Sequence, residues 1–86
     1  MKFEFDPEKS GANQRKHGMD FIAAQALWED PDHLQVPART QGELRFMLIG
    51  RIHGEHWSAI FTPREGRIRI ISVRRSRMEE VGAYED

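Results

Sequence analysis

A stripe of hydrogen-bond donors runs along residues 8–18, EKSGANQRKHG. Its four members recur at i, i+4, i+7 and i+8: Lys9, Asn13, Lys16 and His17. On a helix they share an arc of about 100°. Such a stripe could bind an anion, and its imidazole could transfer a proton near neutral pH. In the alternative interpretation, Glu8 and Asp20 pair with these cations locally, or His17 simply suits the negative end of a helix.

The second group of candidates is an arginine-rich segment. Residues 64–77 contain six arginines against one acid, Glu65, and so carry a charge of +5, although the whole chain has a net charge of −1. Guanidinium groups make forked contacts with phosphate or carboxylate, which makes this segment a candidate phosphate-binding element. The arginines are Arg64, Arg67, Arg69, Arg74, Arg75 and Arg77.

Strand alternation divides these arginines between two faces. Arg67, Arg69 and Arg75 share one face, and Arg74 lies on the other, in each case beside isoleucine or valine. Because a buried guanidinium needs a partner or a ligand, we expect Arg69, or Arg74 with Arg75, to face a groove that holds a phosphate. The alternative is that the arginines form ion pairs with nearby acids, namely Glu79, Glu80 or Asp86.

The sequence argues against several other chemistries. The HGEH segment at residues 53–56 has two histidines without a clear third ligand, so we expect no metal and no other cofactor. There is no Walker loop, GxSxG or HExxH motif, which argues against nucleotide hydrolysis, serine hydrolase and metalloprotease activity. The chain has no cysteine, no signal-peptide pattern and no apolar run of about 20 residues. We therefore expect a cytoplasmic protein without a membrane segment.

Helix signals surround the donor stripe. Asp6 as N-cap, Pro7 in the first turn and Gly18 after the last turn predict a helix over residues 7–17. Ala12 is its only ordinary apolar residue, so the sequence does not explain what this helix packs on. A second predicted helix, over residues 21–30, has the apolar face that the first one lacks.

The rest of the chain predicts strands and a final helix. The expected strands cover residues 2–5, 33–36, 44–53, 57–62 and 67–74. Gly54–Glu55 is predicted to form a type II′ hairpin turn. Ser76 and Glu79 form a predicted capping box at the start of a helix over residues 77–85.

This order of elements predicts an α+β fold in one domain, residues 1–86. We expect an antiparallel sheet of about four to five strands, two N-terminal helices and a C-terminal helix. The tight hairpins and the lack of long crossovers favour helices packed on one face of the sheet.

Three segments carry a resemblance to a known family: FEFDPEKS…N..KHG, LIGRI and GRIRIISVRRSRMEE…YE. Together they span nearly the whole chain, and they resemble the BrnT toxins of bacterial type II toxin–antitoxin systems. The resemblance implies a fold similar to that of RelE-type ribonuclease toxins, RNA cleavage, and inhibition of translation. It also implies neutralisation by a small ribbon-helix-helix antitoxin of the BrnA type, through which the complex would bind operator DNA.

The resemblance also assigns residues. The basic residues of the family correspond to six candidate catalytic residues: Lys9, Lys16, His17, Arg69, Arg74 and Arg75. Tyr84 also matches the family. Together with Asn13 of the donor stripe and Arg67 and Arg77 of the arginine-rich segment, it is a candidate for substrate binding. Gly11 and Gly82 depart from the pattern expected of the family, and both weaken the helices that contain them.

We expect metal-independent cleavage in which the strand arginines bind the phosphate and His17 or Lys16 moves a proton. Two other classes of function use the same basic surface. One is a non-catalytic module that binds RNA or DNA, and the other is a docking surface for an acidic protein.

Overall fold

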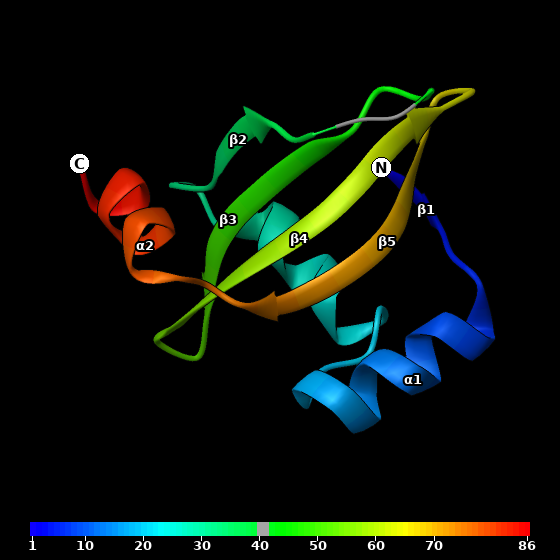
Figure 1. Ribbon diagram of the computed structural model, residues 1–86, viewed down its shortest axis with the longest axis horizontal. Helices are drawn as coiled ribbons and strands as arrows, with labels where there is room; N and C mark the ends of the chain where they lie inside the picture. The colour runs from blue at the N-terminus through cyan, green and yellow to red at the C-terminus, as the bar shows by residue number, and fades with distance from the viewer. Residues whose placement is uncertain (40–41) are drawn as a thin grey trace.

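The computed structural model describes residues 1–39 and 42–86 (Figure 1). Within these ranges, five strands and three helical segments follow one another. They are β1 (Lys2–Glu4), α1 (Pro7–His17), η1 (Ala23–Glu29), β2 (Leu34–Pro37), β3 (Phe46–Ile52), β4 (Glu55–Arg64), β5 (Arg67–Arg75) and α2 (Met78–Glu85). Within the described ranges, no helix is both long and apolar enough to span a bilayer.

The sheet is mixed, which corrects the expectation of a purely antiparallel one. Its strand order is β1-β5-β4-β3-β2, and β1 pairs with β5 in parallel, with Glu4 opposite Arg69. The other neighbours pair antiparallel. Hydrophobic alternation predicts which face of a strand is buried but not the direction in which it pairs, so the sequence pattern could not distinguish these arrangements.

One face of the sheet packs on η1 and forms the core. η1 is a single 3-10 helix of seven residues, shorter than the helix predicted over residues 21–30. The N-cap position is occupied by Ile22, and Asp20 Oδ1 accepts from the N–H of Ala23, the first residue of η1, at 2.8 Å. The predicted apolar face is nevertheless correct, because Phe21, Ala24 and Leu27 are buried. The main buried apolar residues are Met19, Phe21, Ala24, Leu27, Leu48, Trp57, Ala59, Phe61, Ile70 and Val73.

Helix α1 is held by polar side chains, which explains how it packs without an apolar stripe. The predicted bounds are confirmed, with Asp6 accepting from the Glu8 N–H and Gly18 at a positive φ of 83°. The two buried residues are Ser10 and Asn13, whereas Ala12 is exposed.

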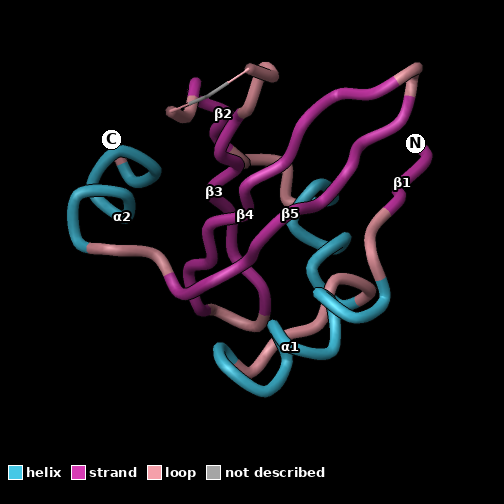
Figure 2. The backbone as a smooth tube through the Cα atoms, turned by 45° about the vertical axis from the view of Figure 1, so that its right-hand side comes forward, coloured by secondary structure: helices cyan, strands magenta, loops and turns pink. Residues whose placement is uncertain are grey.

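Helix α2 packs on the opposite face of the sheet from η1. In Figure 2 the strands lie between α2 and η1. The prediction that all helices share one face is therefore wrong. The predicted capping box is also shifted by one residue: Glu80, not Glu79, accepts from the backbone N–H of Arg77 at 3.0 Å. Ser76 instead bonds Ser58 on β4 through their hydroxyl groups, at 2.8 Å.

The β3–β4 hairpin also differs by one residue from the prediction. Ile52 pairs with Glu55, so the two turn residues are His53 and Gly54. Both have positive φ, 51° and 81°, as a type I′ turn requires, and this replaces the predicted type II′ turn at Gly54–Glu55.

Candidate nucleic-acid interface

A bulge in β5 decides which arginines share a face. Thr62 on β4 pairs with Arg69 and Phe61 pairs with Ile70, but Ile60 then pairs with Ser72, which leaves Ile71 as an extra residue. An extra residue reverses the alternation beyond it. The simple alternation predicted from the sequence is therefore wrong for the end of the strand.

As a result, four arginines lie on the face of β4 and β5 that points away from the core. We call this surface the arginine face and define it by Arg64, Arg67, Arg69 and Arg74. Figure 1 looks onto it, with η1 behind the strands. The side chain of Arg75 projects from β5 on the core side, the same side as the buried Val73.

At one end of the arginine face, three guanidinium groups surround the carboxylate of Glu4. Arg69 Nη1 lies 2.9 Å from Glu4 Oε2, and both Arg64 and Arg67 reach the same carboxylate at 3.9 Å. Glu4 comes from the neighbouring β1. This cluster therefore carries two more positive charges than its single acid can balance.

At the other end, Arg74 forms a forked pair with Glu80 of α2. Its two terminal nitrogens donate to the two carboxylate oxygens of Glu80, each at 2.8 Å, and Ser58 donates to the same carboxylate. The Arg74 bonds, together with the Arg77 N–H and the Ser58 hydroxyl, outweigh burial and lower the pKa of Glu80 to about 2. The same bond raises the pKa of Arg74. The predicted alternative of an ion pair with Glu80 is confirmed for Arg74.

Arg75 contacts a different set of groups. Its guanidinium lies 5.5 Å from the ring centre of Trp57, a cation–π distance, and donates to Glu55 at 2.7 Å. The Arg75 and Glu55 side chains are both more than half exposed, so this ion pair is weak and a phosphate could displace it.

Asn13 positions the cations of α1 beside the end of β5. Its amide nitrogen donates to the carbonyl oxygens of both Val73 and Met19 at 2.8 Å, and its oxygen accepts from the Val73 N–H at 3.1 Å. The sequence predicts that Asn13 binds substrate, but all its hydrogen-bonding groups are used within the fold. It joins the segment that follows α1 to the outer edge of β5.

The other donors of the stripe lie on either side of Asn13. Ser10, about 60° around the helix, accepts from the backbone just before η1, so that side of α1 faces the core layer. Lys9 and Lys16 lie on the other side of Asn13 from Ser10, about 40° and 60° around the helix axis from Asn13. This side faces the arginine face, and both lysines are exposed. His17 lies on the same side as Ser10 and is half-buried.

The local pairing suggested as an alternative for these cations is not observed. In the described part of the chain, Lys9, Lys16 and His17 form no ion pair. Asp20 instead accepts from the backbone N–H of Ala23 at the start of η1.

The two candidates from the C-terminal segment lie on α2. Arg77 is exposed at the start of the helix. The hydroxyl of Tyr84 donates to Asp30 Oδ2 at 2.7 Å, and this bond, with burial, raises the pKa of Tyr84 to about 12. Burial alone would raise the pKa of Asp30, but hydrogen bonds from Tyr84 and from the backbone N–H groups of Asp32 and Arg51 outweigh it and lower the pKa.

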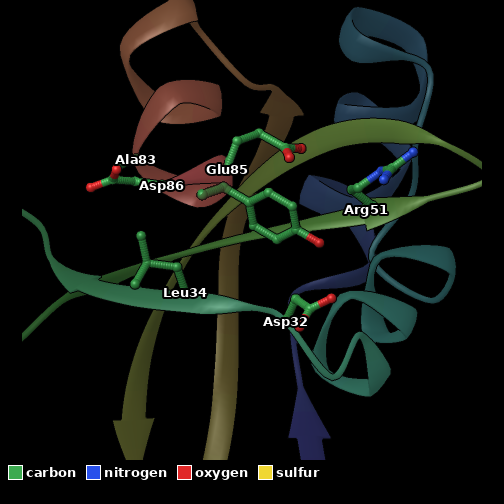
Figure 3. Close-up of a pocket in the computed structure, with 7 residues that line it drawn as sticks. Asp32, Leu34, Arg51, Ala83, Glu85 and Asp86 are labelled. Atoms are coloured by element: carbon green, nitrogen blue, oxygen red, sulfur yellow. The ribbon is translucent and has the colours of Figure 1, made fainter.

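A pocket of about 430 Å³ beside α2 does not suit an RNA phosphate. Of the described residues that line it, Arg51 alone is cationic and three are acidic, as the labelled side chains in Figure 3 show. A phosphate there would meet net negative charge. The lining residues are Asp32, Leu34, Arg51, Ala83, Tyr84, Glu85 and Asp86.

Several residues that organise this surface are not singled out by the sequence. His56, whose sequence context suggests only a zinc ligand, is hydrogen-bonded through Nε2 to Glu85 Oε2 at 2.7 Å. Within the described residues, no three histidine or acidic side chains gather as a metal site would require. Glu4 and Asp30 lie far in sequence from the groups they bind, so no local pattern could identify them.

Comparison with protein families identifies the family of the chain. The family model described as "ribonuclease toxin, BrnT, of type II toxin-antitoxin system" matches residues 5–80. A search of curated proteins found no match to the chain. Because the family match covers most of the 86 residues, the chain belongs to the BrnT family of ribonuclease toxins.

Proposed function

We propose that this member of the BrnT family is a metal-independent endoribonuclease that cleaves RNA in the cytoplasm and so inhibits translation. A type II toxin has an antitoxin partner, and we propose that it is a small ribbon-helix-helix protein of the BrnA type that carries the complex to operator DNA. The proposed likeness to RelE-type toxins stays a prediction.

The observation that carries the proposal is the pairing of Asn13 with Val73, because it holds the basic end of α1 beside the end of β5. By helix and strand periodicity, we expect Lys16 and Arg74 on the arginine-face side of this pairing, and His17 and Arg75 on its core side. We propose that the scissile phosphate binds at this junction, where four cationic or titratable groups come from two elements.

Cleavage of RNA without a metal requires three contributions. A base must take the proton of the 2′-hydroxyl, the charge on the phosphorane must be stabilised, and an acid must protonate the 5′-oxygen as the P–O5′ bond breaks. The products are a 2′,3′-cyclic phosphate and a 5′-hydroxyl. We propose that Arg74 and Arg75 stabilise the phosphorane, and that His17 and Lys16 divide the two proton transfers.

The decisive experiment is incubation of the purified protein with bulk RNA in excess EDTA. We expect degradation of RNA by the parent protein, and loss of at least about tenfold in rate for Lys16→Ala and for Arg75→Ala. Both side chains are exposed, so these variants should fold. Arg15→Ala is the matched control, because Arg15 is an exposed cation next to Lys16 that lies on the far side of α1 from Asn13. Cleavage that requires added Mg²⁺, or equal rates in all variants, would contradict the proposal.

One observation favours a non-catalytic binding module as the second candidate. Each arginine of β5 already has a carboxylate within 4 Å, on Glu4, Glu55 or Glu80. Cations that are paired in this way can bind a nucleic acid or an acidic protein without doing chemistry. A protein that retards RNA in a gel, leaves it intact and is harmless on expression would support this second candidate.

A further inference from the structure

The cluster around Glu4 contains more arginines than its one carboxylate can balance. Arg64 and Arg67 are directly opposite each other across β4 and β5, next to the hairpin turn. Like charges directly opposite on neighbouring strands destabilise a sheet. One carboxylate offsets only part of this repulsion, so the cluster is unfavourable for stability and favourable for binding an anion.

The hydrogen-bonding capacity of the cluster is also unfilled. Arg69 donates to Glu4 at 2.9 Å, but the 3.9 Å contacts of Arg64 and Arg67 are too long to be hydrogen bonds. In the described ranges, neither Arg64 nor Arg67 donates a side-chain hydrogen bond to another group. Their side chains are 57% and 52% exposed, so an anion in solution can reach both guanidinium forks.

The cluster lies at a distance from the proposed cleavage junction. Arg69 precedes Arg74, the arginine of the junction that lies on the same face, by five residues on β5, which corresponds to about 17 Å along the strand. The surface between them is the arginine face, where Ser72 and Ile60 are only partly buried. One RNA strand of several nucleotides could therefore contact both ends of this face.

We infer that Arg64, Arg67 and Arg69 form a second phosphate subsite, which binds the RNA backbone several nucleotides away from the scissile phosphate. Glu4 is the internal anion that holds Arg69 in place and competes with the phosphate. This inference rests on the proposed function, and it assigns to the N-terminal strand a role in substrate affinity. Planar guanidinium forks suit phosphate oxygens, and the alignment of the cluster with the cleavage junction along one strand favours RNA over an acidic protein.

The test compares two lengths of RNA. The substrates are a single-stranded 12-nucleotide RNA and a dinucleoside monophosphate, which is too short to reach both ends. For the double variant Arg64→Ala/Arg67→Ala, we expect KM for the 12-mer to rise about tenfold with kcat within about twofold of the parent. The plot of the logarithm of the RNA association constant against the logarithm of the salt concentration should become less steep by about 1.4. This corresponds to about 0.7 for each phosphate that the variant no longer neutralises. Kinetics on the dinucleoside should not change.

Arg45→Ala is the matched control, because Arg45 is paired one-to-one with Glu43 at 3.1 Å and lies outside the cluster. A second variant, Glu4→Gln, removes the competing anion at constant size and should lower KM for the 12-mer several-fold. Thermal unfolding of each variant separates loss of affinity from loss of structure.

The outcomes are distinguishable. If the parent cleaves the 12-mer and the double variant has the same KM and the same salt slope, the subsite is overturned while the proposed function stands. If the parent neither binds nor cleaves RNA, both are overturned. If the double variant loses affinity for poly-glutamate but keeps its affinity for RNA, the cluster belongs to an acidic protein partner and the inference is overturned.

Discussion

Asn13 occupies the position that a neighbouring strand would take beside Val73. Its amide accepts from the Val73 N–H at 3.1 Å and donates to the Val73 carbonyl at 2.8 Å, in the part of β5 that β1 is too short to cover. The Asn13 side chain therefore fills the hydrogen bonds of the Val73 N–H and C=O at the open edge of β5. It also attaches a helix with few apolar residues to the sheet.

Replacing this residue should cost both stability and activity. Asn13→Ala leaves the N–H and C=O of Val73 and the C=O of Met19 without their partner, and each buried unsatisfied group costs about 1–3 kcal/mol. We expect a loss of about 3 kcal/mol in unfolding free energy, measured with urea, and faster hydrogen exchange at the Val73 amide. Gln14→Ala, an exposed neighbour on the same helix, is the control. Unchanged exchange at Val73 would contradict this assignment.

Acid should unfold the protein partly through Glu80. Its pKa is about 2 in the folded state against an ordinary value of 4.5, so its ionised form stabilises the fold at neutral pH, and this contribution disappears as the pH falls from about 4.5 to 2. The shift corresponds to about 3 kcal/mol. We expect Glu80→Gln to be less stable than the parent by about this amount at pH 7 and about equal to it near pH 2.

Urea unfolding at a series of pH values checks this prediction. The difference between parent and variant isolates Glu80 from the other acids that titrate in this range. Glu79→Gln, at the exposed neighbouring position, should show no comparable pH-dependent difference. A stability difference that is constant from pH 7 to pH 2 would rule out the ionised pair with Arg74 as its source.

Tyr84 is the only tyrosine in the chain, which makes its titration directly visible. The bond to Asp30 raises its pKa to about 12, so the stability that this bond contributes is present below pH 10 and is lost as the pH rises through 12. We expect tyrosinate absorbance in the folded protein to appear about two pH units higher than in urea. Asp30→Asn should lower the midpoint in the folded state; an unchanged midpoint would show that Asp30 is not the cause.

The β3–β4 turn predicts a stabilising substitution. His53 has a φ of 51°, which asparagine adopts more readily than histidine in the first position of a type I′ turn. We expect His53→Asn to raise the unfolding free energy by about 0.5–1 kcal/mol. Glu65→Asn should act in the same way in the β4–β5 turn, where φ is 52°. A loss of stability at both positions would argue for a different turn type.

The sequence predicts the elements whose signals are local. Asp6, Pro7 and Gly18 mark the ends of α1, and the apolar spacing of Phe21, Ala24 and Leu27 identifies the buried face of η1. The α+β class and the family are also correct. These features depend on neighbouring residues, so a single sequence contains them.

The features that organise the candidate site depend on distant residues. The extra residue Ile71 reverses the alternation of β5 and brings Arg69 and Arg74 to one face, although their spacing predicts opposite faces. The role of Asn13 arises only because β1 ends at Glu4 and leaves an edge of β5 open. Neither the bulge nor the role of Asn13 has a local sequence signal. The bulge depends on the pairing of β5 with β4, and the role of Asn13 depends on how little of β5 is covered by β1.

The parallel pairing of β1 with β5 has a consequence for synthesis. Lys2 to Glu4 are synthesised long before their partners, Arg67 to Arg69, and Asn13 long before its partner, Val73. Most of the nascent chain must therefore emerge before the N-terminal strand and helix can dock. A chain interrupted before β5 would lack the arginines of the proposed cleavage junction and the strand edge on which α1 docks, so an incomplete translation product should be harmless to the cell that makes it.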